Sequence, residues 1–169
     1  MADFSGNWVC TGREGDWSAF LKATGEGWVT RKLMAKGNYG VGLVKSEISM
    51  PDGCKTLHIK TKAGRFLKTS VSIDTNGTTF DFDTGSGTGS GTCVWRGETL
   101  VFTVTGPPEA VYERSLTSTN GKTVMMVRGE CKGVCASTIH EKQDRTRDIA
   151  EEATSSSTEE EEDVGELET

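Results

Sequence analysis

The sequence predicts an all-β chain whose ten antiparallel strands close into an up-and-down barrel, capped by a helix-turn-helix between the first and second strands. From Tyr39 onward, apolar residues recur with a period of two, and turn signals such as Asn76-Gly77 and Asn120-Gly121 return about every eight to twelve residues. A short segment before this region has helical spacing instead. Short strands in meander order favour closure, because a closed barrel has no exposed edges.

The two helices are expected directly after the first strand. Trp17, Phe20 and Leu21 follow helical spacing, and Asp16 is placed to cap the N-terminus of this helix. Glycines end the first helix, and a second short helix is expected over 29–34. The strands are expected near residues 5–11, 39–49, 55–61, 66–73, 78–82, 92–96, 99–105, 110–117, 122–131 and 134–142.

The interior of this barrel is expected to hold a cavity. About half of the alternating positions are apolar, and Thr, Ser, Lys and Gly occupy many of the others. Such a composition does not fill a barrel with dense hydrocarbon, and barrels of this strand number can enclose a ligand. The sequence therefore favours a water-lined cavity.

The end of the chain differs in composition from the rest. Residues 144–169 contain eleven of the 25 acidic residues but only two of the 19 basic ones, so this part carries about −9 and residues 1–143 about +3. A segment this poor in apolar residues cannot bury enough surface to offset its ordering entropy. We therefore expect a barrel domain over residues 1–143 and a disordered acidic tail over residues 144–169.

Several classes of protein are disfavoured by the sequence. The mildly basic body lacks the dense Lys/Arg stripe of a nucleic-acid-binding protein. Neither a signal-peptide pattern nor an apolar run of membrane-spanning length occurs, and the five cysteines include no CxxC pair. These features favour a cytoplasmic protein. With two histidines and scattered cysteines, no metal site or cofactor is expected.

Five short motifs, in this order and spacing, resemble one family. Residues 4–143 resemble the intracellular lipid-binding proteins, the fatty-acid-binding and cellular retinoid-binding group. The matching motifs are Phe4–Trp8 (Phe-x-Gly-x-Trp), Trp17–Lys22, Gly25–Lys32 (Gly-x-Gly-Trp-x-Thr-Arg-Lys), Gly77–Asp81 and Lys132–Val134.

The resemblance implies a calycin barrel, lipocalin-like, that serves as a non-enzymatic carrier of fatty acids, retinoids or related lipids. It also implies a monomer whose helical cap acts as a portal and is able to touch a membrane transiently. On this interpretation Trp17, Leu21 and Met34 line the inner side of the portal.

The anchor for the ligand departs from the family pattern. The family often holds a carboxylate with two arginines and a tyrosine, the last pair as Arg-x-Tyr on the final strand. Here Thr138 and His140 take those two positions. The other arginine corresponds to the 110–117 strand, where either Arg114 or Glu113 faces inward. Because Thr and His hold a carboxylate less firmly than a bidentate Arg, a broader or neutral apolar ligand is favoured over a strict fatty acid.

Two catalytic look-alikes have simpler explanations. The sequence Phe82-Asp83-Thr84-Gly85 resembles the catalytic loop of aspartic proteases, but that chemistry needs two aspartates. The Gly/Ser-rich run over 85–91 lacks the Gly-Lys-Ser/Thr ending of a phosphate loop and is expected to be a flexible connection between strands. Two alternatives to a carrier stay open: a barrel enzyme that uses His140 as its acid–base group, and an adaptor that works through its acidic tail.

Overall fold

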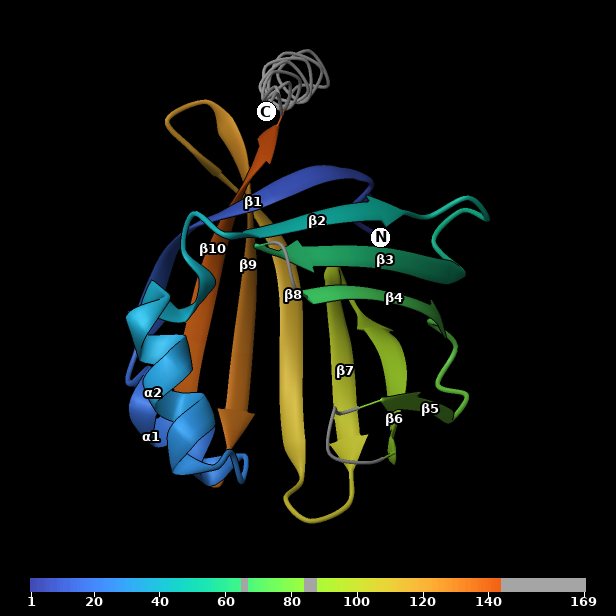
Figure 1. Cartoon of the computed structure of the whole chain (residues 1–169). Helices are drawn as coiled ribbons and strands as arrows, with labels where there is room; N and C mark the ends of the chain where they lie inside the picture. Colours follow the sequence, from blue (N-terminus) through green and yellow to red (C-terminus); the bar gives the residue numbers. More distant parts are fainter. Residues whose placement is uncertain (65–66, 84–87, 144–169) are drawn as a thin grey trace, which may run out of the picture.

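The computed structural model describes residues 1–64, 67–83 and 88–143, and these residues form the capped barrel that the sequence predicts. Ten antiparallel strands follow one another in the order β4-β3-β2-β1-β10-β9-β8-β7-β6-β5, so that the first and last strands pair (Figure 1). The order ends at β4 and β5, which leaves a seam there, and the barrel is therefore nearly closed. The strands are β1 Gly6–Gly15, β2 Val44–Ser49, β3 Thr56–Ala63, β4 Leu67–Asp74, β5 Phe80–Asp83, β6 Thr88–Arg96, β7 Thr99–Thr105, β8 Ala110–Thr119, β9 Lys122–Cys131 and β10 Val134–Gln143.

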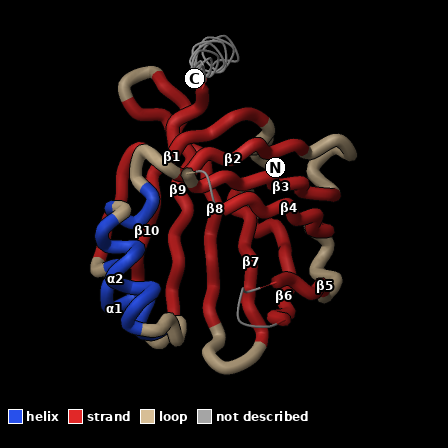
Figure 2. Tube along the Cα trace, in the orientation of Figure 1, coloured by secondary structure: helices blue, strands red, loops and turns tan. Residues whose placement is uncertain are grey.

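Two helices lie between β1 and β2. The first helix, α1, spans Trp17–Ala23, and the carboxylate of Asp16 accepts a hydrogen bond from the Ala19 N–H at 2.9 Å, as an N-cap does. The second helix, α2, spans Trp28–Lys36 and is followed by a short 3-10 turn, η1, at Asn38–Gly40. Only α1 packs closely on the sheet, against β9 and β10, while α2 packs on α1 (Figure 2). No helix in the described part of the chain is long and apolar enough to cross a membrane.

Several boundaries differ from the sequence-based prediction, and β1, for example, continues to Gly15 where its end was expected at residue 11. The second strand begins at Val44, not at residue 39, because Asn38 and Tyr39 take positive φ angles of 48° and 54° inside the 3-10 turn. The predicted flexible connection over 85–91 is wrong where it can be tested, since β6 already begins at Thr88. The remaining residues of that connection, and the predicted tail at 144–169, lie outside the described residues.

Two apolar clusters fill opposite parts of the interior. The larger one joins Phe4 and Trp8 to side chains from β2, β3, β4, β6, β7 and β9, and the smaller one forms around Phe20 of α1. Along β8, Ala110 belongs to the smaller cluster and Leu116 packs against the larger one. Between these two residues, the inward-facing positions of β8 are Tyr112, which packs against the smaller cluster, and Arg114, and both line a cavity.

Candidate ligand-binding cavity

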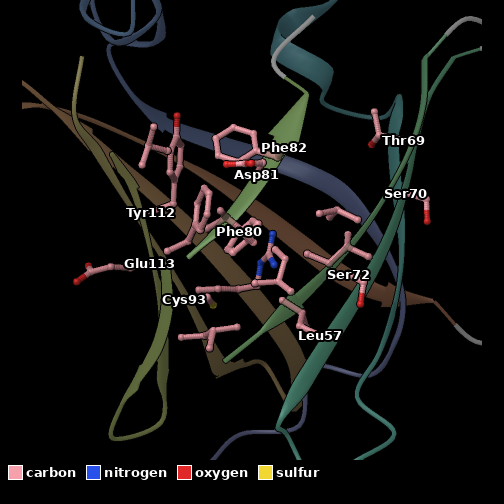
Figure 3. A pocket seen from close by; sticks show the side chains of 18 of the residues that line it. Leu57, Thr69, Ser70, Ser72, Phe80, Asp81, Phe82, Cys93, Tyr112 and Glu113 are labelled. Carbon is pink, nitrogen blue, oxygen red and sulfur yellow. The ribbon is translucent and has the colours of Figure 1, made fainter. Parts of the chain in front are cut away.

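A cavity of about 810 Å³ lies inside the barrel. This size falls within the roughly 300–1,000 Å³ of typical small-molecule sites. Strands β3 to β9 line the cavity, and the helices contribute none of its lining (Figure 3). Its wall is mainly apolar or aromatic, formed by Leu57, Ile59, Val71, Ile73, Phe80, Phe82, Leu100, Phe102, Val104, Tyr112 and Val127.

Phe102 is the centre of an aromatic group in this wall. Its ring centroid lies 5.4 Å from that of Phe80, 5.5 Å from Phe82 and 6.0 Å from Tyr112. Tyr112 in turn meets Phe20 of α1 edge to face at 6.2 Å. A continuous row of rings thus runs from the cap to β5, beside the seam, and presents apolar faces to the cavity.

Arg114 brings a positive charge to this apolar wall. Its neighbour Glu113 points away from the cavity (Figure 3), and its carboxylate binds Arg128 at 3.2 Å. Because successive side chains of a strand face opposite sides, Arg114 faces inward, and it is among the lining residues. The Arg114 Nε atom is buried and has no hydrogen-bond partner within the described residues. Burial lowers the pKa of Arg114, and nearby Cys93 opposes that shift. Burial also raises the pKa of the Cys93 thiol to about 11, so this thiol is neutral and supplies no negative charge to the guanidinium.

Thr138 and His140 are not among the residues that line the cavity, and they contact one another. The His140 Nε2 atom and the Thr138 hydroxyl are 2.9 Å apart, while the Nδ1 atom of His140 is buried without a partner in the described residues. Burial, and then the charge of Arg114, lower the pKa of His140 to about 4, so the imidazole is neutral at neutral pH. Arg114 pairs with Val127, which pairs with Thr138, so the threonine lies two strands from the arginine on the same face.

The three residues predicted on the cap do not line the cavity. Trp17 donates its indole N–H to the Ser137 carbonyl at 3.2 Å and packs against Phe20, which fixes α1 to β10. Leu21 is buried beneath α1, and Met34 is half-buried on α2. Of the six residues singled out from the sequence, Arg114 alone is among the lining residues.

The aromatic group and Cys93 are the functional features that the sequence analysis did not single out. Phe80 and Phe82 alternate on one strand, and Phe102 and Tyr112 lie on two others. The alternation of Phe80 and Phe82 was a usable signal that both side chains lie on one face of β5. Their meeting depends on the pairing of β7 with β8, in which Phe102 lies opposite Tyr112, and single-strand periodicity does not contain that register.

Several solved structures share this fold. The chain superposes on the REP1-NXSQ fatty acid transporter with a TM-score of 0.70 and 26% sequence identity, over 85% of this chain and 98% of the other. Fatty-acid-binding protein 1 of Echinococcus granulosus gives 0.68 and 16% identity over 85% and 100%. The fluorescent protein UnaG gives 0.66 and 21% identity over 83% and 97%. No protein-family model and no curated protein sequence matches the chain.

These matches define the class of protein. A ten-stranded, nearly closed barrel with two helices between β1 and β2 and a cavity inside is the architecture of fatty-acid-binding proteins. The similarity extends over most of the chain, which confirms the resemblance found in the sequence. Fold and cavity together indicate that the protein binds a hydrophobic ligand.

Proposed function

We propose that the protein is a non-enzymatic cytoplasmic carrier that holds one small hydrophobic ligand, such as a fatty acid, a retinoid or a related lipid, inside its barrel. The observation that carries the proposal is the union of an aromatic cavity wall with the cation of Arg114, whose buried Nε atom has no hydrogen-bond partner among the described residues. An amphiphile matches both, because its apolar chain covers the rings while its polar or acidic end meets the guanidinium.

The energetics of such a ligand are favourable. Each buried methylene contributes about 0.8 kcal/mol, so a long acyl chain offers on the order of 10 kcal/mol before ordering costs. After those costs, affinities of roughly micromolar to nanomolar follow. The anchor is a single arginine, with Thr138 and His140 where the family has its second arginine and its tyrosine. Ligands other than strict carboxylates are therefore included in the proposal.

The helical cap supports a further part of the proposal, transient contact with membranes by a monomeric protein. On α2, Trp28 is 62% exposed, Val29 61% and Leu33 69%. Lys32 lies over the Trp28 ring, with its ammonium nitrogen 4.8 Å from the ring centroid. An apolar helix face with basic neighbours suits the boundary between headgroups and acyl chains. Residues 1–143 would form the carrier domain, and residues 144–169 a separate acidic tail.

The enzyme alternative is less favoured by the chemistry of the interior. A general base works best when its pKa is near the operating pH, whereas that of His140 is lowered to about 4. Its partner Thr138 offers a hydroxyl but no charge to raise that pKa. We therefore expect His140→Gln to bind the ligand as the parent does, and we expect the substitution to abolish no turnover of the ligand.

A matched pair of substitutions on β4 tests the carrier proposal. Thr69 shares the inward face with Val71 and Ile73, whereas Ser70 and Ser72, whose backbone also borders the cavity, share the outward face of β4. Thr69→Trp places an indole in the cavity and should weaken displaceable binding of a fluorescent fatty acid, while Ser70→Trp should bind like the parent. Competition with an unlabelled fatty acid and with a retinoid then ranks the ligand classes. Absence of saturable, displaceable binding by the parent would refute the carrier function.

A further inference from the structure

Three lysines form a row across the outer face of the barrel. In the strand register, Lys45 of β2 lies directly opposite Lys62 of β3, and Lys62 lies directly opposite Lys68 of β4. All three residues are exposed. Like charges placed directly opposite each other destabilise a sheet. We call Lys45, Lys62 and Lys68 the lysine row.

The row contrasts with the position beside it. Two residues along β3, Lys60 lies opposite Glu47, and the two side chains form an ion pair with a 3.8 Å separation. For Lys62 and Lys68, no acidic side chain among the described residues lies within ion-pair distance. At Lys62 and Lys68 the outer surface therefore has positive charge that the described barrel does not compensate.

We propose that the acidic stretch Glu159–Asp163 of the same chain docks on the lysine row. Five consecutive carboxylates form this stretch, and residues 144–169 as a whole carry about −9 against about +3 for residues 1–143. The occupant and the surface are thus complementary in charge. Because both belong to one chain, docking proceeds at an effective concentration in the millimolar range, well above that of any cytoplasmic competitor at micromolar level.

The place where the tail begins allows it to reach the row. Gln143, the last residue of β10, pairs with Asn7 of β1, and Glu141 pairs with Val9, which pairs with Lys45. With about 4.8 Å between neighbouring strands, Lys45 lies about 10 Å and Lys68 about 19 Å from β10.

The length of the intervening chain fits those distances. Fifteen residues lie between Gln143 and Glu159. For the disordered tail that its composition predicts, a segment of this length has a root-mean-square span of about 22 Å. The acidic stretch therefore samples the neighbourhood of the row without being stretched. Lys68 also belongs to the residues around the cavity, so the docked tail lies beside the seam between β4 and β5.

Amide NMR of the full-length protein tests this docking. In one variant, Glu159→Gln, Glu160→Gln, Glu161→Gln, Glu162→Gln and Asp163→Asn neutralise the acidic stretch and leave the barrel sequence untouched. We expect its amide shifts to differ from those of the parent along the outer row of β2, β3 and β4. This difference should disappear between about 0.02 M and about 0.5 M salt, where the screening length falls to about 4 Å.

Charge reversal on the barrel supplies the second half of the test. Lys62→Glu with Lys68→Glu should abolish the shift difference between acidic and neutralised tails. The control, Lys36→Glu with Lys55→Glu, changes net charge equally on two other exposed lysines and should keep the difference. The proposal is overturned if the acidic and neutralised tails give the same amide shifts, or if their difference remains after charge reversal of the row. It is also overturned if the difference spreads evenly over all basic residues. Binding of the parent to anionic vesicles through the row, unaffected by neutralising the tail, would also overturn it.

Discussion

Removal of the charge of Arg114 should weaken the binding of acidic ligands while making the empty protein more stable. Arg114→Gln takes away the cation on the inner face of β8, while Lys68 at the edge of the cavity stays in place, and it keeps a polar side chain of moderate length. A hydrogen bond to a charged group is worth about 1.5–3 kcal/mol, so a carboxylate ligand should lose about 10- to 150-fold in affinity. The methyl ester of the same acid lacks the charge and should change little.

Stability should move in the opposite direction. A buried cation without a partner is unfavourable, and a neutral replacement of similar volume is often stabilising by about 1–4 kcal/mol. Arg114→Met should therefore raise the unfolding free energy of the ligand-free protein, measured by urea denaturation. The guanidinium is in this view retained for binding at the expense of stability.

The assay is competition between a fluorescent fatty acid and a matched acid and ester pair, with the parent, Arg114→Gln and Arg96→Gln. Arg96 is exposed at the end of β6, so its substitution controls for the loss of one positive charge. The reasoning is refuted if Arg114→Gln binds the acid as the parent does. It also fails if acid and ester weaken equally, because that result would indicate a packing defect and not a lost anchor.

Three further predictions concern stability and the cap. Because the folded-state pKa of His140 is about 4 and its ordinary value is 6.5, the unfolded chain binds the proton more tightly. The contribution of His140 to the unfolding free energy is thus complete above about pH 6.5, and on the order of 3 kcal/mol is lost as the pH drops to about 4. Urea titrations of His140→Gln should not show this loss. Gly129→Ala places a methyl group 2.6 Å from the ring of Phe20 on α1 and should cost about 1–3 kcal/mol of unfolding free energy, whereas Gly37→Ala, whose methyl group meets its nearest neighbours only at 3.7 Å, should cost little; equal effects would contradict the tight fit. Trp28→Ser with Leu33→Ser should slow stopped-flow transfer of a fluorescent fatty acid to anionic vesicles and leave its affinity unchanged, and an unchanged transfer rate would remove the cap from membrane contact.

Local signals in the sequence were sufficient for the architecture. The Asp16 cap and the helical spacing from Trp17 predict α1, because both depend on residues three or four positions apart. Period-two alternation predicts the strands for the same reason. The start of β2 was missed because Tyr39 and Val41 continue the alternation of the following strand, while the backbone at Tyr39 turns into positive φ.

The cavity was less predictable because it depends on register. A shift of one residue exchanges Glu113 and Arg114 between the inside and the outside of the barrel, and periodicity alone left both open. The structure has Glu113 paired with Arg128 on the outer face of β8 and β9, an arrangement across two strands. Charged side chains are rarely buried without a partner, so composition does not predict a cation such as Arg114 in the interior. Such a group is selected for a ligand and not for the fold.

A cavity with one cation in place of a three-residue clamp should select its ligands by their apolar part more than by their headgroup. The contact with Arg114 is worth about 1.5–3 kcal/mol, which equals the burial of only two to four methylenes at about 0.8 kcal/mol each. In the same competition assay, each added methylene should improve affinity about fourfold until the cavity of about 810 Å³ is filled. Exchange of the carboxylate for an ester should then be compensated by a chain two to four carbons longer. A series in which the acid is always preferred by more than a thousandfold, whatever its length, would show that further polar groups hold the headgroup, and Thr138 and His140 would be the first to examine.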